Sequence, residues 1–183
     1  MKKIFPLGML MLAGVTIGSA AHAELKDYIP DVKEYLPESK LTPKDYSEWN
    51  FGAGMTQRLA HVNAEWVNPY GIAYAKVGAF INGDHEIGGQ VGFRIPVEFK
   101  GEDKNGFYVG VYGGSLQTKT VDGKDEAQYG AGADLAYVLL SKERISTFSV
   151  GIGAGSELHD KNGRMIVETR PQVQFSYTLS VGF

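Results

Sequence analysis

The feature that most constrains this chain is an apolar–polar alternation with a period of two, which continues to the last residue. In the final stretch, PQVQFSYTLSVGF (171–183), every second residue is apolar, and those between are small or polar. Chain ends usually fray, because little ties them down. A period of two places the apolar side chains on one face of a β-strand. We therefore expect the chain to end in a strand that is paired along its whole length.

The same alternation recurs in seven earlier runs, which begin at Trp49. These runs lie within residues 49–56, 60–66, 71–81, 86–97, 107–112, 128–139 and 147–155. Turn sequences such as NPYG (68–71) and HDKNG (159–163) separate them, although the first connection, near Gln57-Arg58, has neither glycine nor proline. Each strand with its connection takes roughly 17 residues, which is typical of an up-and-down barrel. The sequence therefore predicts an all-β domain of eight antiparallel strands.

The composition of the polar face indicates which way the strands point. Between the apolar residues stand mainly Gly, Ser, Thr, Asn and Gln, without the dense Lys/Glu cover of a water-facing sheet. A barrel interior, where small residues leave room for a few large polar ones, has this composition. The apolar face would then meet lipid, and closure would satisfy the backbone hydrogen bonds. We predict an eight-stranded antiparallel up-and-down transmembrane β-barrel over residues 49–183.

The first 48 residues contain two segments of different character. Lys2 and Lys3 precede a short apolar run, and Ala21-His22-Ala23 offers the small residues that a signal peptidase reads, so we expect residues 1–23 to be a cleaved signal peptide. Residues 24–48 are charged, contain three prolines and no glycine, and space their apolar residues as a helix does. We expect a short periplasmic segment, helical or irregular, with a helix start at Thr42-Pro43. A disordered leader is the alternative.

Six charged or titratable residues fall on the polar faces and are predicted to project into the barrel lumen: His61, Glu65, Lys76, Glu86, Arg94 and Asp134. Counting along the strands places Glu65, Arg94 and Asp134 at similar heights. We expect these three to form an ion-pair network, because an unpaired buried charge is costly. The polar residues either fill and rigidify the interior or line a narrow pathway, and an eight-stranded barrel is only just wide enough for its own side chains.

Composition excludes several classes of function. The absence of cysteine removes disulfides, thiolate zinc sites and cysteine nucleophiles, and a net charge of −3 gives no support for nucleic-acid binding. The four histidines show no ligand spacing, so we expect neither a metal nor another cofactor. No serine–histidine nucleophile signature is present, and we expect no enzyme. A lipid-modifying outer-membrane enzyme is the first alternative, and a soluble periplasmic lipid-binding barrel, with its apolar face inward, is the second.

In strand number, outward apolar alternation and a last strand ending in Phe183, the chain resembles the small bacterial outer-membrane β-barrels of the outer membrane protein A membrane-domain type. The likeness covers residues 49–183 and the signal peptide. In that group a terminal aromatic, with apolar residues at alternate positions before it, is the signal read by the barrel-assembly machinery; the matching residues are Tyr177, Leu179, Val181 and Phe183. Length and the VGF ending are also similar to YfaZ-type outer-membrane proteins, from which residues 24–48 depart. The resemblance implies a monomer in the bacterial outer membrane, in contact with its lipids, with a structural or narrow porin-like passive role.

Overall fold

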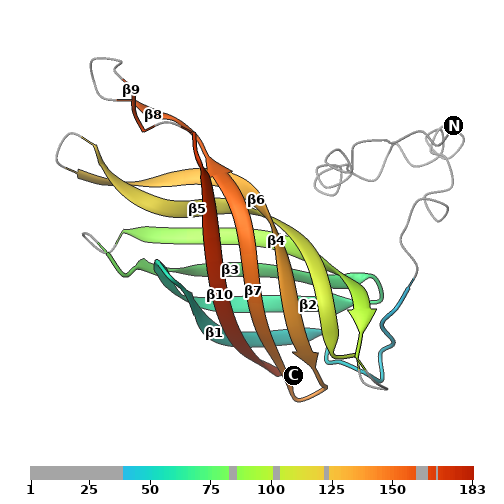
Figure 1. Ribbon diagram of the computed structural model, residues 1–183. Helices are drawn as coiled ribbons and strands as arrows, with labels where there is room; N and C mark the ends of the chain where they lie inside the picture. The colour runs from blue at the N-terminus through green and yellow to red at the C-terminus, as the bar shows by residue number, and fades with distance from the viewer. Residues whose placement is uncertain (1–38, 83–85, 101–103, 122–123, 160–164, 168) are drawn as a thin grey trace, which may run out of the picture. The chain divides into compact units, whose positions relative to one another are not determined.

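The computed structural model describes residues 39–82, 86–100, 104–121, 124–159, 165–167 and 169–183. The chain divides into two compact units, Met1–Pro37 and Glu38–Phe183, of which the first lies outside the described residues. The signal peptide predicted at 1–23 and most of the periplasmic segment predicted at 24–48 therefore also lie outside them. The second unit is a closed β-barrel (Figure 1).

Within the described residues the chain forms strands and no helix. The barrel strands are β1 (Trp49–Thr56), β2 (Leu59–Asn68), β3 (Gly71–Phe80), β4 (Ile87–Phe99), β5 (Gly106–Val121), β6 (Lys124–Leu140), β7 (Arg144–Gly155) and β10 (Pro171–Gly182). Each pairs antiparallel with its neighbours, and β10 closes the barrel by pairing with both β7 and β1. Strands β8 (Leu158–His159) and β9 (Met165–Val167) form a separate two-stranded sheet. The predicted all-β, eight-stranded antiparallel barrel is confirmed.

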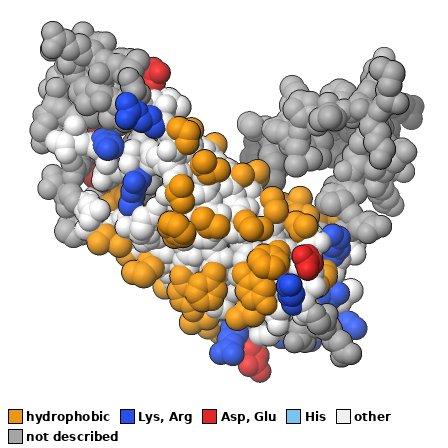
Figure 2. Space-filling view, in the orientation of Figure 1, with side chains coloured by type: hydrophobic (Ala, Val, Ile, Leu, Met, Phe, Trp, Pro, Cys, Tyr) orange, Lys and Arg blue, Asp and Glu red, His pale blue; other side chains and the backbone are white. Residues whose placement is uncertain are grey.

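The alternation points its apolar side outward. In β1, Trp49, Phe51 and Met55 are exposed, whereas Asn50 and Thr56, which point to the opposite face, are buried. Every barrel strand has exposed apolar side chains of this kind, including Val62, Val77, Val91, Val111, Leu135, Val150 and Val173. Figure 2 shows the apolar side chains as a broad belt on the visible wall, with Lys, Arg, Asp and Glu side chains toward its two ends.

Strands β5 and β6 extend furthest beyond the runs that the alternation predicted. Residues 107–112 and 128–139 were expected as strand, but β5 and β6 continue their pairing to Lys119↔Glu126 and Val121↔Lys124. A bulge between Ser115 and Gln117 shifts the register at the start of this extension. Such a bulge puts one extra residue into a strand and interrupts the period of two. The apolar–polar alternation therefore ends at the bulge, although the strand continues beyond it.

Glycines make room for the large side chains inside this narrow barrel. A Cβ atom at Gly92 would lie 2.5 Å from the ring of Tyr74, and one at Gly132 would lie 2.6 Å from the ring of Tyr112. Both tyrosines are buried. These two glycines thus leave space for a ring on a neighbouring strand, as the composition of the polar face indicated.

Residues 39–48, which we call the cap, close the barrel end where β1 begins and β10 finishes. The N–H groups of Lys40 and Leu41 donate to the carbonyl of Pro69, at 3.1 and 3.2 Å, and the Ser47 hydroxyl donates to the carbonyl of Lys142 at 2.8 Å. Leu41 and Tyr46 belong to one buried apolar cluster with residues of β2, β3, β5, β6 and β7: Val67, Ile72, Tyr108, Ala136, Val138, Leu140 and Ile145.

The helix start expected at Thr42-Pro43 is instead a single turn. The Asp45 N–H donates to the Thr42 carbonyl at 2.8 Å, and the Thr42 N–H donates to the Asp45 carboxylate at 3.1 Å. Burial alone would raise the pKa of Asp45, but the hydrogen bonds from Thr42 outweigh it and hold that pKa below its usual value. Because Tyr46 is anchored in the barrel end and β1 begins at Trp49, too few residues remain for a helix.

A double-mutant cycle tests whether Tyr112 packs against the space left by Gly153. The nearest atom to a Cβ placed at Gly153 is the Tyr112 hydroxyl oxygen, at 2.9 Å. We expect Gly153→Ala to lower the free energy of unfolding by about 1–3 kcal/mol through overpacking. The penalty should shrink in a Tyr112→Phe background, which removes that oxygen. Urea unfolding of the four variants measures the coupling, and an equal penalty in both backgrounds would show that the hydroxyl is not the obstacle.

Candidate functional site

Five of the six residues predicted to face the lumen are buried inside the barrel, with exposed fractions between 1% and 6%: His61, Glu65, Lys76, Arg94 and Asp134. Glu86 differs from the prediction, because its side chain is exposed. It lies just before the first residue of β4, where the alternation of the strand no longer decides which way a side chain points.

Arg94 and Asp134 form a buried ion pair inside the barrel. The guanidinium donates to the carboxylate through Nε at 3.1 Å and through a terminal nitrogen at 2.5 Å. The same terminal nitrogen lies 3.3 Å from the Ser149 hydroxyl, and the guanidinium carbon lies 4.4 Å from the centre of the Tyr74 ring. Charge-assisted bonds to both nitrogens fix the guanidinium in one orientation.

Gly110 makes this ion pair possible. Arg94 is on β4 and Asp134 on β6, with β5 between them, and Gly110 of β5 is the register partner of both residues. A Cβ atom at Gly110 would lie 2.4 Å from a carboxylate oxygen of Asp134 and 2.7 Å from Cγ of Arg94. The two side chains therefore meet across a strand that presents no side chain at that position.

The ion pair does not extend to a second carboxylate. Among the described residues, Arg94 pairs with Asp134, and Lys100 pairs with Glu98 on the exposed surface. Glu65, expected to join the network, makes no ion pair with a described residue, and its Oε2 has no hydrogen-bond partner among them. Lys76 donates to a hydroxyl, that of Ser176, at 3.1 Å.

A second polar cluster, which the sequence analysis did not identify, lies toward the opposite barrel end from the cap. Arg58 donates to the side-chain oxygens of Gln117 and Gln172, at 2.8 and 2.6 Å. Gln117 and Gln172 donate in turn to the oxygen of Gln128, at 2.7 and 3.0 Å. We call these four residues the glutamine layer. Uncharged glutamines on a polar face give little signal, and Arg58 was assigned to a connection.

The interior is closed at three levels. At the cap, Tyr108 and Ile145 have no exposed surface; at the ion pair, Arg94 is 1% exposed; in the glutamine layer, Gln128 has no exposed surface. Side chains that line a water-filled channel keep water-accessible surface. The four side chains named here keep at most 1% of theirs.

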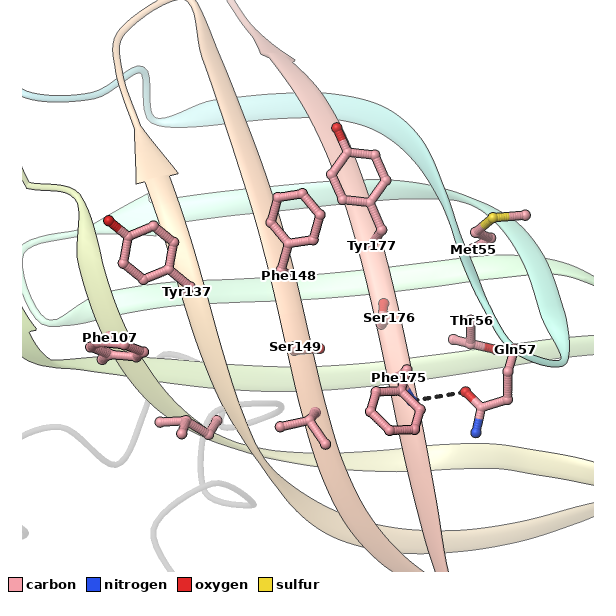
Figure 3. A pocket seen from close by; sticks show the side chains of 12 residues that line it. Met55, Thr56, Gln57, Phe107, Tyr137, Phe148, Ser149, Phe175, Ser176 and Tyr177 are labelled. Atoms are coloured by element: carbon pink, nitrogen blue, oxygen red, sulfur yellow. Dashed lines mark hydrogen bonds between the residues drawn. The ribbon is translucent and has the colours of Figure 1, made fainter.

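A groove of about 560 Å³ lies on the outer face of the barrel (Figure 3). Its walls include the aromatic pairs Phe107–Tyr137 and Phe148–Tyr177, whose ring centres lie 5.2 and 4.5 Å apart. Gln57 stands at one end, beside Phe175. The lining residues include no histidine, and within the described residues neither ring nitrogen of His61 has a hydrogen-bond partner. The groove is thus part of the apolar belt and holds no serine–histidine pair.

The energetic role of the ion pair can be measured against the exposed pair. We expect Asp134→Leu to lower the free energy of unfolding by about 3–5 kcal/mol, because it leaves the buried Arg94 charge unpaired. The double variant Arg94→Met/Asp134→Leu should recover most of that loss. The control Glu98→Ala should change stability by less than about 0.5 kcal/mol, since its partner Lys100 is exposed. Denaturant titrations provide the values; equal effects of Asp134→Leu and Glu98→Ala would contradict the assignment.

The barrel itself is the basis for assigning a function. Across the described ranges, no three His, Cys, Asp or Glu side chains form a group that could hold a metal ion. The same ranges contain no helix with the length and hydropathy of a membrane span. Comparisons with protein-family models, with curated proteins and with solved structures found no match to this chain.

Proposed function

We propose that the protein is a bacterial outer-membrane β-barrel with a structural role and a plugged interior. The observation that carries this proposal is the inverted polarity of the barrel. Apolar side chains are exposed around the whole wall, while charged and amide side chains are buried within it. Soluble monomers rarely expose apolar patches larger than a few hundred Å². In a bilayer the belt contacts acyl chains, and a closed sheet satisfies its backbone hydrogen bonds internally.

The aromatic residues support this location. Trp49, Phe51, Trp66 and Phe183 form a chain of ring contacts, with centres 6.0 to 6.4 Å apart, at the barrel end where β10 finishes. Aromatic girdles of transmembrane barrels lie at such positions, level with the lipid headgroups. The residues of the proposed assembly signal also face outward: Tyr177, Leu179, Val181 and Phe183. The barrel-assembly machinery and the outer-membrane lipids are the partners that follow from this proposal.

A structural role is favoured over a narrow channel. The cap, the ion pair and the glutamine layer each contain side chains with little or no exposed surface, so ions would have to displace all three. The enzyme alternative predicts a serine–histidine pair, and among the described residues neither ring nitrogen of His61 has a hydrogen-bond partner. The soluble lipid-binding alternative requires an apolar interior, and the ion pair and glutamines occupy that place.

A charge placed in the belt tests whether the outer face meets lipid. Val150 is exposed in the middle of β7, between the apolar partners Leu135 and Phe175. In lipid vesicles we expect Val150→Arg to lower the free energy of unfolding by about 2–4 kcal/mol. The control Glu143→Arg, at the exposed turn between β6 and β7, should change it by no more than about 0.5 kcal/mol.

Cell fractionation of the wild-type protein distinguishes a membrane barrel from a soluble lipid-binding barrel. We expect the wild-type protein in the outer-membrane fraction, soluble only with detergent and with a gel mobility that changes on boiling. A freely soluble protein, whose stability is unaffected by Val150→Arg, would overturn the proposal.

Conductance measurements separate a plugged barrel from a channel. We expect no stepwise ion current when the detergent-purified protein is added to a planar lipid bilayer, because the interior is closed at three levels. A porin of known conductance, added afterwards to the same bilayer, confirms that insertion can be detected. Discrete current steps from the wild-type barrel would contradict the structural role and favour the passive channel.

A further inference from the structure

Strand β10 is longer than its neighbour β1 at the barrel end remote from the cap. It pairs with β7 from Pro171 to Val181, but with β1 only from Ser176 to Gly182. Residues 171–175 therefore have no strand partner on the β1 side. A strand edge of this kind presents N–H and C=O groups that need hydrogen-bond partners and that can pair with another chain.

The sequence explains why β1 stops at Thr56. The Thr56 hydroxyl oxygen accepts hydrogen bonds from the N–H groups of Arg58 and Leu59, at 3.1 and 2.8 Å. A threonine that captures the next backbone N–H groups forms a turn without glycine or proline. This turn directs the chain into β2 and away from β10.

The side chain of Gln57 then occupies the position that β1 has left. The register that pairs Met55 with Tyr177 would place Gln57 opposite Phe175 if the strand continued. Its side-chain oxygen accepts the N–H of Phe175 at 2.8 Å, the bond drawn in Figure 3. Its side-chain nitrogen donates to the carbonyl of Val173 at 2.7 Å. A primary amide offers an acceptor and a donor side by side, as a strand edge does.

We infer that Gln57 serves as a side-chain extension of β1, which closes the seam between β1 and β10 above the last backbone pair. Two further features complete the closure. Arg58 bonds to Gln172 from inside the barrel, at 2.6 Å. Pro171 has no N–H, and it lies an even number of residues from Phe175, so its missing donor falls on the same edge.

This inference does not rest on the proposed location in a membrane. It concerns the pairing of two strands, and it holds for a barrel in detergent, in lipid or in water. At residues 171–175 the edge of β10 is secured by side chains rather than by a backbone ladder, so a single substitution there can expose a strand edge.

Amide hydrogen exchange at Phe175 tests the inference directly. In the folded wild-type barrel we expect the Phe175 amide to be protected, and we expect Gln57→Ala to accelerate its exchange at least tenfold. Gln57→Glu, which can still accept but cannot donate to Val173, should retain much of the protection. The matched control is Gln174→Ala, which removes a glutamine amide that bonds to Gln90 rather than to this edge; exchange at Phe175 should remain as in the wild type.

Two results would overturn the inference. One is fast exchange at Phe175 in the wild-type protein itself, which needs no variant to fold. The other is equal protection of Phe175 in the wild type and in a folded Gln57→Ala barrel. Exchange at Thr178, which lies within the backbone-paired part of β10, reports in each sample whether the barrel is folded.

Discussion

Closure of the sheet between β1 and β10 is the constraint on which the rest of the structure depends. Every backbone group in a strand needs a partner, and a closed ring of eight strands supplies partners within the chain. The ring is narrow, so its inward positions accept either small residues or a few large side chains that pass over glycines. The last strand is paired to Gly182 because the ring cannot close without it. The alternation continues to Phe183 because the last strand must pair along its length to close the barrel.

Closure with the apolar face outward forces the polar side chains into a space with little water. The chain meets that cost by bonding buried polar groups to one another across strands. The ion pair between Arg94 and Asp134 joins β4 to β6, and Gly110 of β5 leaves the path between them open. A shift of β5 by one residue would bring a valine between the two charges, since Val109 and Val111 flank Gly110. The interior contacts therefore depend on one register and help to specify it.

The alternation predicted the strands well where one face of the barrel wall is apolar and exposed and the other is polar and buried. All eight barrel strands lie where the period of two placed them, and His61, Glu65, Lys76, Arg94 and Asp134 are inside. The strand ends were predicted wrongly where the strands extend beyond the apolar belt. Beyond the belt, the extensions of β5 and β6 need no apolar face, and residues such as Lys119 and Glu126 give no strand signal.

Both members of the ion pair were among the three residues predicted to form a network, but which carboxylate pairs with Arg94 could not be predicted. Counting along strands gives the height of a residue only when the stagger between strands is known, and the stagger is a property of the closed barrel. Strand positions placed Glu65, Arg94 and Asp134 at similar heights, but only Arg94 and Asp134 pair, and Oε2 of Glu65 has no hydrogen-bond partner among the described residues. The sequence predicted that the interior is polar. It could not predict which interior residues pair, because pairing depends on the stagger between strands, which cannot be derived from any one strand.

The connection between β1 and β2 shows how tertiary contacts can replace local turn chemistry. Residues 57 and 58 include no glycine or proline, which made this the least marked connection in the sequence. Thr56 forms the turn with its hydroxyl, Gln57 bonds outward to β10, and Arg58 bonds inward to the glutamine layer. Three consecutive side chains thus turn the chain, complete a strand edge and close the barrel mouth. The partners of Gln57 and Arg58 are distant in sequence, so composition alone could not reveal these two roles. Only the turn at Thr56 is local.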